Sequence, residues 1–131
     1  MSVLLRIIDQ TPGRPSVNHP NLDLPLECVT ARAIIARRVE AEVAALNTGE
    51  EPRPSHVFEP AAAECALNGA RSAPVRWINP VRSVEIALEA FAAKRFLLLL
   101  NGKQVVELDM PLILAPDSEA RFLRLVPLVG G

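Results

Sequence analysis

The sequence predicts a single α+β domain, residues 1–131, in which a small sheet packs against one long helix. Three observations support this prediction: strand-like apolar segments near the start, an uninterrupted helical segment from Ala31 to Leu46, and a return to strand patterning from Phe96 onward. A chain of 131 residues has the usual size of one domain. Half of its residues are apolar and 22% are charged, a composition typical of a chain that folds rather than of a disordered one.

Two strands are expected before the long helix. Val3 to Asp9 is rich in Val, Leu and Ile, and it ends at the proline- and glycine-containing residues 11–15, which favour a turn. In Asn21 to Glu27, leucines alternate with polar residues or proline, a period of two that is typical of a half-buried strand. Because Pro25 lacks an amide donor, this second strand should be short or lie at a sheet edge.

The long helix is predicted to begin after Thr30, whose hydroxyl can accept a hydrogen bond from a free amide of the first turn. Ala31 to Leu46 contains neither proline nor glycine. One face carries apolar residues at helical spacing, which predicts that it packs on the core: Ile35, Val39, Val43 and Leu46. The other faces are expected to carry the charged residues Arg37, Arg38, Glu40 and Glu42.

Residues 48–94 are expected to form a helical insertion between the long helix and the third strand, with a short helix near Ala61–Leu67. A second helix should begin at Asn79-Pro80 and run to about Ala93, because asparagine caps helices and proline suits the first helical position. Its apolar residues are expected to face the core: Val81, Val84, Leu88 and Phe91. Trp77 is interpreted as a core residue or, alternatively, as an anchor for a partner.

Phe96 to Leu100 and Lys103 to Leu108 are predicted to form a hairpin, since Asn101-Gly102 favours a tight turn. The unbroken apolar run of the first of these strands predicts that it is covered on both faces. Arg121 to Val126 is the expected last strand. Its alternation of apolar and charged residues does not decide which of its faces points inward.

The composition argues against several classes of function. The net charge is −1 and the basic residues are scattered, so neither nucleic-acid nor membrane-surface binding is expected. No segment approaches the roughly 20 apolar residues of a membrane helix, and a cytoplasmic protein is therefore expected. The potential metal ligands lack zinc-site spacing, and the two thiols are expected to be buried and unpaired: His19, His56, Cys28 and Cys65. No phosphate loop or nucleophile elbow is present, so we expect no bound cofactor and no intrinsic catalysis.

Residues 96–131 resemble the C-terminal part of ubiquitin. Phe96 to Gln104, which reads Phe-Leu-Leu-Leu-Leu-Asn-Gly-Lys-Gln, is similar to a strand and turn of that protein, and Phe122 to Gly131 is similar to its last strand with the diglycine tail. The ending Pro-Leu-Val-Gly-Gly also resembles the sulfur carriers of the same superfamily, such as the small subunit of molybdopterin synthase. The resemblance implies a ubiquitin-like β-grasp fold, with a mixed sheet of four to five strands on the long helix and a flexible tail, residues 127–131. The insertion has no counterpart in ubiquitin and suggests an elaborated bacterial ubiquitin-like protein.

The diglycine tail suggests a specific chemistry. Glycines present no side chain and accept unusual backbone angles, so they can pass through a narrow channel of an adenylating enzyme. Attack of the Gly131 carboxylate on the α-phosphate of ATP would give an acyl-adenylate and pyrophosphate, and a thiolate or sulfide could then take the acyl group. Gly131 and Gly130 are thus the predicted activation site, with enzyme contacts from Pro127, Leu128 and Val129. The ATP belongs to the partner enzyme.

The resemblance also implies a partner-binding patch and a linkage site. Alignment on Gly102-Lys103 and on the terminal glycines assigns the patch to Leu99, Leu123 and Leu125, although all three can equally be core residues. Lys103 corresponds to the lysine of ubiquitin that is most used for chain linkage, and its alternative role is that of a solvated hairpin residue.

Three functions are compatible with the sequence. The first is a protein modifier, with an adenylating enzyme of the ubiquitin-activating type, a conjugating enzyme and an isopeptidase as partners. The second is a sulfur carrier that ends in a thiocarboxylate. The third is a non-covalent interaction module whose tail is idle.

Overall fold

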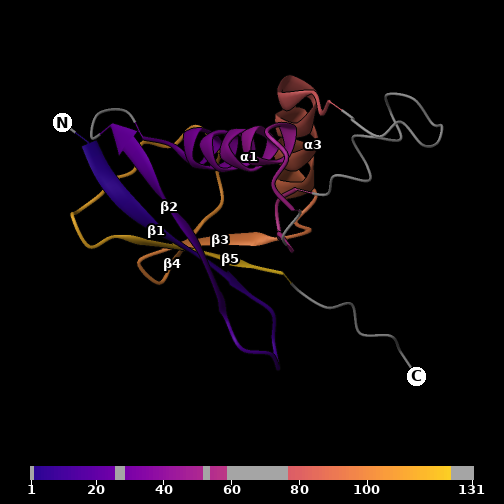
Figure 1. The fold of residues 1–131 in the computed structure, drawn as a ribbon. Coiled ribbons are helices and arrows are strands. Elements are labelled where there is room, and N and C mark those ends of the chain that lie inside the picture. Colours follow the sequence, from indigo (N-terminus) through magenta and orange to yellow (C-terminus); the bar gives the residue numbers. More distant parts are fainter. Residues whose placement is uncertain (1, 26–28, 52–53, 59–76, 125–131) are drawn as a thin grey trace.

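The computed structural model describes residues 2–25, 29–51, 54–58 and 77–124. These residues form an α+β fold in which the two helices lie on one face of a five-stranded mixed sheet (Figure 1). In chain order the elements are β1 (Ser2–Gln10), β2 (Val17–Pro25), α1 (Ala31–Asn47), α3 (Pro80–Ala92), β3 (Leu97–Leu100), β4 (Lys103–Val105) and β5 (Glu119–Leu123). The expected short helix near Ala61–Leu67 and both cysteines, Cys28 and Cys65, lie outside the described residues.

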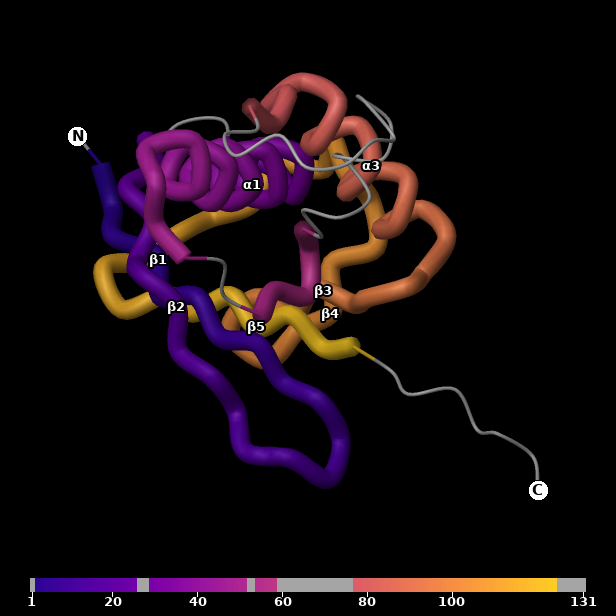
Figure 2. Tube along the Cα trace, turned by 45° about the vertical axis from the view of Figure 1, so that its right-hand side comes forward, coloured from indigo at the N-terminus to yellow at the C-terminus, as the bar shows by residue number. Residues whose placement is uncertain are grey.

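The strand order is β2-β1-β5-β3-β4, so the first and last strands of the chain lie side by side within the sheet (Figure 2). β1 and β5 are parallel, from Arg6 opposite Glu119 to Gln10 opposite Leu123, and the other pairs are antiparallel. Two parallel neighbouring strands cannot be joined by a tight turn. The elements from β2 to β4 therefore form the connection between β1 and β5. The predicted mixed sheet of four to five strands on a long helix is therefore confirmed at this level.

β2 begins at Val17, four residues before the predicted start at Asn21. Its added residues are mostly polar or proline, and they extend the strand because they pair with β1, as Asn18 does with Ile8. The period-two pattern did not predict this extension, since these residues are held by backbone pairing rather than by burial. β2 lies at an edge of the sheet, as Pro25 predicted.

α1 begins after Thr30, whose hydroxyl accepts a hydrogen bond from the Ala33 amide at 3.2 Å, as predicted. The expected apolar face is confirmed, because Ile35, Val39 and Val43 are buried and Leu46 packs against the core. The expected position of Arg38 on a solvent-facing side is wrong, since Arg38 is only 2% exposed.

α3 has the predicted start, with the Asn79 side chain accepting hydrogen bonds from the amides of Val81 and Arg82. Three of the predicted residues lie on the core side, because Phe91 is buried and Val84 and Leu88 pack against the core. The buried face also includes Ser83 and Ala87, which were not predicted. Val81 is 68% exposed and Trp77 is 60% exposed, so their expected places in the core are wrong. α3 packs against α1, and the small side chains of Ser83 and Ala87 allow close approach on a face that the apolar spacing did not identify.

The hairpin of β3 and β4 forms at Asn101 and Gly102, whose φ angles of 51° and 86° are those of the predicted tight turn. β4 ends at Val105 rather than at Leu108. Leu98 and Leu100 point to the helix side and are buried, whereas Leu97 and Leu99 lie on the opposite face and are half-buried. The prediction that β3 is covered on both faces is therefore wrong for the described residues.

Because neighbouring leucines of β3 point to opposite faces of the sheet, truncating them should lower the free energy of unfolding by different amounts. Leu98→Ala should lower the free energy of unfolding by about 2–5 kcal/mol, because it leaves a cavity in the core. Leu99→Ala removes the same atoms from a half-buried site and should cost roughly half as much or less. Urea unfolding of both variants measures the difference, and equal costs would show that the two faces of β3 are buried alike.

Candidate functional site

The last strand fixes the point from which the predicted tail departs. Leu123 is the final residue of β5, and the Arg124 amide donates a hydrogen bond to the Gln10 carbonyl oxygen at 3.0 Å. β5 thus ends beside the end of β1, next to the turn that joins β1 to β2. The predicted activation and tail residues lie outside the described residues, as does one member of the patch: Gly130, Gly131, Pro127, Leu128, Val129 and Leu125.

Two of the predicted patch residues, Leu99 and Leu123, lie on the same face of the sheet. β5 alternates with Ala120 and Phe122 inward, so Leu123 points to the face opposite the helices. Leu97 pairs with Leu123 and lies on this face as well, half-buried like Leu99. The outer leucines, as we call Leu97, Leu99 and Leu123, therefore form an apolar surface that includes one residue absent from the prediction. The unbroken apolar run 96–100 gave no sign of which leucines face outward, and the pairing of Leu97 with Leu123 identifies Leu97.

Polar side chains border the outer leucines. Arg121 lies opposite Leu99 and donates hydrogen bonds to Gln10 Oε1 at 2.8 Å and to Glu119 Oε2 at 2.9 Å. Arg6 donates to the same carboxylate at 3.0 Å. Such partly exposed pairs add little stability, but they hold the charged groups at the border of the apolar surface. Lys103 is exposed at the start of the edge strand β4, directly after the β3–β4 turn.

On the helix side, the structure contains a buried ion pair that was not predicted from the sequence. Both guanidinium NH groups of Arg38 donate to Asp9, at 2.6 Å to Oδ1 and 2.7 Å to Oδ2. The two side chains are 2% and 4% exposed, and the guanidinium carbon lies 4.7 Å from the centre of the Phe122 ring. The pair joins α1 to the central strands β1 and β5, because Asp9 lies opposite Phe122.

Further groups surround the Asp9 carboxylate. The backbone amide of His56 donates to Oδ2 at 3.2 Å, and Nε2 of His19 lies 2.9 Å from the same oxygen without the geometry of a directed hydrogen bond. Glu42 Oε2 accepts from Nε of Arg38 at 2.7 Å. The Asp9 cluster, defined as Asp9, His19, Arg38, Glu42 and His56, thus ties together β1, β2, α1 and the segment 54–58.

The cluster keeps both members of the pair ionised. Burial alone would raise the pKa of the Asp9 carboxyl, but the contacts with Arg38 and His19 outweigh it and hold that pKa far below its usual range. Burial would likewise lower the pKa of Arg38, whereas the hydrogen bond to Asp9 and the charge of Glu42 raise it. Two signals pointed to this pair: a carboxylate within the apolar run of β1, and the spacing of Arg38 from Ile34 and Ile35 on the buried stripe of α1.

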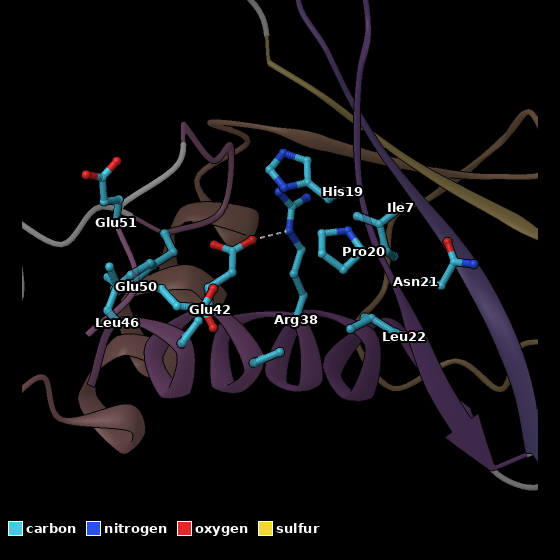
Figure 3. A pocket seen from close by; sticks show the side chains of 13 residues that line it. Ile7, His19, Pro20, Asn21, Leu22, Arg38, Glu42, Leu46, Glu50 and Glu51 are labelled. Carbon is cyan, nitrogen blue, oxygen red and sulfur yellow. Dashed lines mark hydrogen bonds and ion pairs between the residues drawn. The ribbon is translucent and has the colours of Figure 1, made fainter. Parts of the chain in front are cut away.

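A cavity of about 240 Å³ adjoins the Asp9 cluster, between the C-terminal half of α1, strands β1 and β2, and residues Glu50, Glu51 and Phe58 (Figure 3). Its apolar lining includes Leu22 and Leu46 besides Phe58, and its polar lining includes His19, Arg38 and three glutamates, Glu42, Glu50 and Glu51. The cavity was not predicted from the sequence, because these residues meet only through the tertiary fold.

Residues 2–25, 29–51, 54–58 and 77–124 hold neither a metal-ligand cluster nor a membrane-spanning helix. These residues contain no group of three or more His, Cys, Asp or Glu side chains placed to hold a metal ion. Among the same residues, neither helix has the length and apolar character needed to cross a membrane.

Comparison with known proteins gives no relative: no protein-family model, curated protein or solved structure matches the chain. The assignment of a site therefore depends on the residues and geometry described above.

Removing one partner of the buried pair should be strongly destabilising. Asp9→Asn keeps the size of the side chain but leaves the Arg38 cation without its main counter-charge, and we expect a loss of about 3–5 kcal/mol in the free energy of unfolding. Asp23→Asn is the matched control, because Asp23 is exposed on the neighbouring strand and should change stability by less than about 0.5 kcal/mol. Urea unfolding at neutral pH measures both.

The same variants give the pH dependence. Asp9 has a lower pKa in the folded than in the unfolded state, so its stabilisation is complete above the unfolded pKa of about 4 and is lost as the pH falls below it. The difference in stability between the wild type and Asp9→Asn should therefore shrink from pH 5 to pH 3. A difference that stays constant over this range would contradict the low pKa of Asp9.

Proposed function

We propose that the chain is a ubiquitin-like protein modifier of β-grasp fold, in which the Gly131 carboxylate is adenylated by an enzyme of the ubiquitin-activating type and then transferred to a target. The observation that carries the proposal is the diglycine ending only a few residues after a sheet strand, in a sequence whose preceding hairpin resembles that of ubiquitin. A conjugating enzyme and an isopeptidase would be further partners.

The described fold supports this proposal. A mixed sheet with a helix across one face is what the resemblance implies, and β5 lies between β1 and β3 within that sheet. Backbone pairing on both sides holds β5 firmly, so a tail that starts at Arg124 begins from a fixed point. An enzyme that binds the sheet and the tail together would bind more tightly, because a tail with a fixed starting point loses less conformational freedom on binding.

The outer leucines support the same proposal. Leu97, Leu99 and Leu123 form an apolar surface on the strand from which the tail continues and on its neighbour. Half-buried apolar groups with a border of arginine and glutamate side chains suit a partner interface with a dry centre and a polar rim. Lys103, the first residue of β4, pairs with Leu100 and therefore lies on the helix side of the sheet, away from this surface. It would be the linkage site if chains are formed.

The second candidate, a sulfur carrier, is favoured by the Pro-Leu-Val-Gly-Gly ending alone. It shares the acyl-adenylate and differs in the acceptor, which would be sulfide rather than a protein thiol. The third candidate, a non-covalent module, would use the outer leucines without any reaction of the tail.

Intact-mass measurement of the chain, purified with an N-terminal tag from the cells that produce it, separates these functions. A modifier predicts adducts of higher mass that disappear when Gly131 is deleted. Ile113→Ala is the matched control, because this 91% exposed side chain belongs to neither the tail nor the outer leucines, and its adducts should persist. The adducts arise only if the terminal carboxylate is activated.

The other outcomes contradict the modifier. Replacement of one oxygen by sulfur at the C-terminus, without adducts, would establish the carrier. An unaltered mass in cells where the chain is bound to partners would leave only the non-covalent module.

A further inference from the structure

The cavity beside the Asp9 cluster contains buried polar atoms without hydrogen-bond partners. Oε1 of Glu42 is buried and makes no hydrogen bond among the described residues, although Oε2 of the same carboxylate accepts from Arg38. Nε2 of His19, on a side chain that is only 6% exposed, also makes no directed hydrogen bond there and has only the short contact with Asp9. Leaving a buried carboxylate oxygen unpaired is costly, so the wall of the cavity is prepared for a hydrogen-bond donor.

The charges of the cavity favour a cation. Among the described residues that line the cavity, Arg38 is the only basic one apart from His19, and the Arg38 charge is already matched by Asp9. The lining also carries the negative charges of three glutamates, Glu42, Glu50 and Glu51. Neither Glu50 nor Glu51 forms an ion pair within the described part of the chain. Figure 3 shows the Glu42 carboxylate between Arg38 on one side and Glu50 and Glu51 on the other. An incoming positive charge would meet carboxylates at the rim and at the wall.

The size and apolar lining restrict the ligand further. A volume of about 240 Å³ far exceeds the roughly 15 Å³ that one water molecule needs. Leu22 and Phe58 are buried and Leu46 is half-buried, so they offer an apolar wall for an alkyl stem. A long side chain with a charged head, such as that of arginine or lysine, combines these two properties.

We propose that this cavity binds an alkyl cation, with a guanidinium or ammonium group donating to Glu42 Oε1 and facing Glu50 and Glu51 while its alkyl stem packs on Leu22, Leu46 and Phe58. The ligand is an arginine or lysine side chain of a partner protein or a free amine with the same chemistry. The cavity lies on the helix side of the sheet, so this site is independent of the diglycine tail and of the outer leucines.

The test is a titration of the ¹⁵N-labelled full chain followed by NMR. Four probes are used: Nα-acetyl-arginine amide, Nα-acetyl-lysine amide, the free amine agmatine, and the neutral isostere Nα-acetyl-citrulline amide. At least one cation should shift the amide signals of residues 19, 21, 22 and 42–51, and citrulline should bind roughly tenfold more weakly or worse, because it lacks the charge. Preference for the capped amino acids indicates a protein side chain as ligand, and preference for agmatine indicates a free amine.

Charge-neutral variants locate the site. Glu50→Gln combined with Glu51→Gln changes exposed residues only, so the fold should persist while cation binding weakens several-fold. Glu42→Gln should have a larger effect, checked by unfolding because Glu42 also contacts Arg38. Glu40→Gln is the matched control, since Glu40 is exposed on the same helix outside the cavity, and it should bind cations like the wild type. Equal binding of arginine and citrulline, no binding of any cation, or binding unchanged in the cavity variants would overturn the proposal.

Discussion

The parallel pairing of β1 with β5 is the constraint on which the rest of the structure depends. It places the first and last strands side by side in the sheet, so the segments between them, including the helices and the β3–β4 hairpin, form one long connection. The buried pair of Asp9 and Arg38 acts at this same place, because Asp9 lies opposite Phe122 and Arg38 crosses from α1 over the Phe122 ring. The helix is thus attached by charge and by apolar packing to the strands that start and finish the fold.

The pairing also separates two surfaces with different chemistry. On the helix side, the core and the Asp9 cluster fill most of the space and leave a cavity with carboxylates in its wall. On the opposite side, the outer leucines form an apolar surface beside the point where the chain leaves the sheet. A residue in β1 or β5 belongs to one surface or the other according to its parity, since successive side chains of a strand point to opposite faces.

Local signals predicted much of this fold. The Thr30 cap, the apolar spacing of α1 and the Asn101-Gly102 turn depend on neighbours in sequence, and each appears in the structure as expected. Arg38, Trp77 and Val81 were placed wrongly because their surroundings are set by other elements: Arg38 by a carboxylate 29 positions away, and Val81 by the close packing of α3 on α1. The resemblance to ubiquitin assigned Leu99 and Leu123 to one patch, and the structure places both on the same face of the sheet. Leu97 was recognised as a third member only from the strand register. Nothing in the sequence pattern predicted the cavity, whose lining comes from β1, β2, α1 and residues that follow α1.

The proposed function depends on whether the terminal carboxylate is a substrate for adenylation, and ATP–pyrophosphate exchange measures that step directly. The assay uses the adenylating enzyme that co-purifies with the tagged chain, with labelled pyrophosphate and ATP. Exchange that requires the intact chain and is lost when Gly131 is deleted is the predicted result. Exchange that proceeds equally with the deleted chain, or a complete lack of exchange with the intact one, would contradict it.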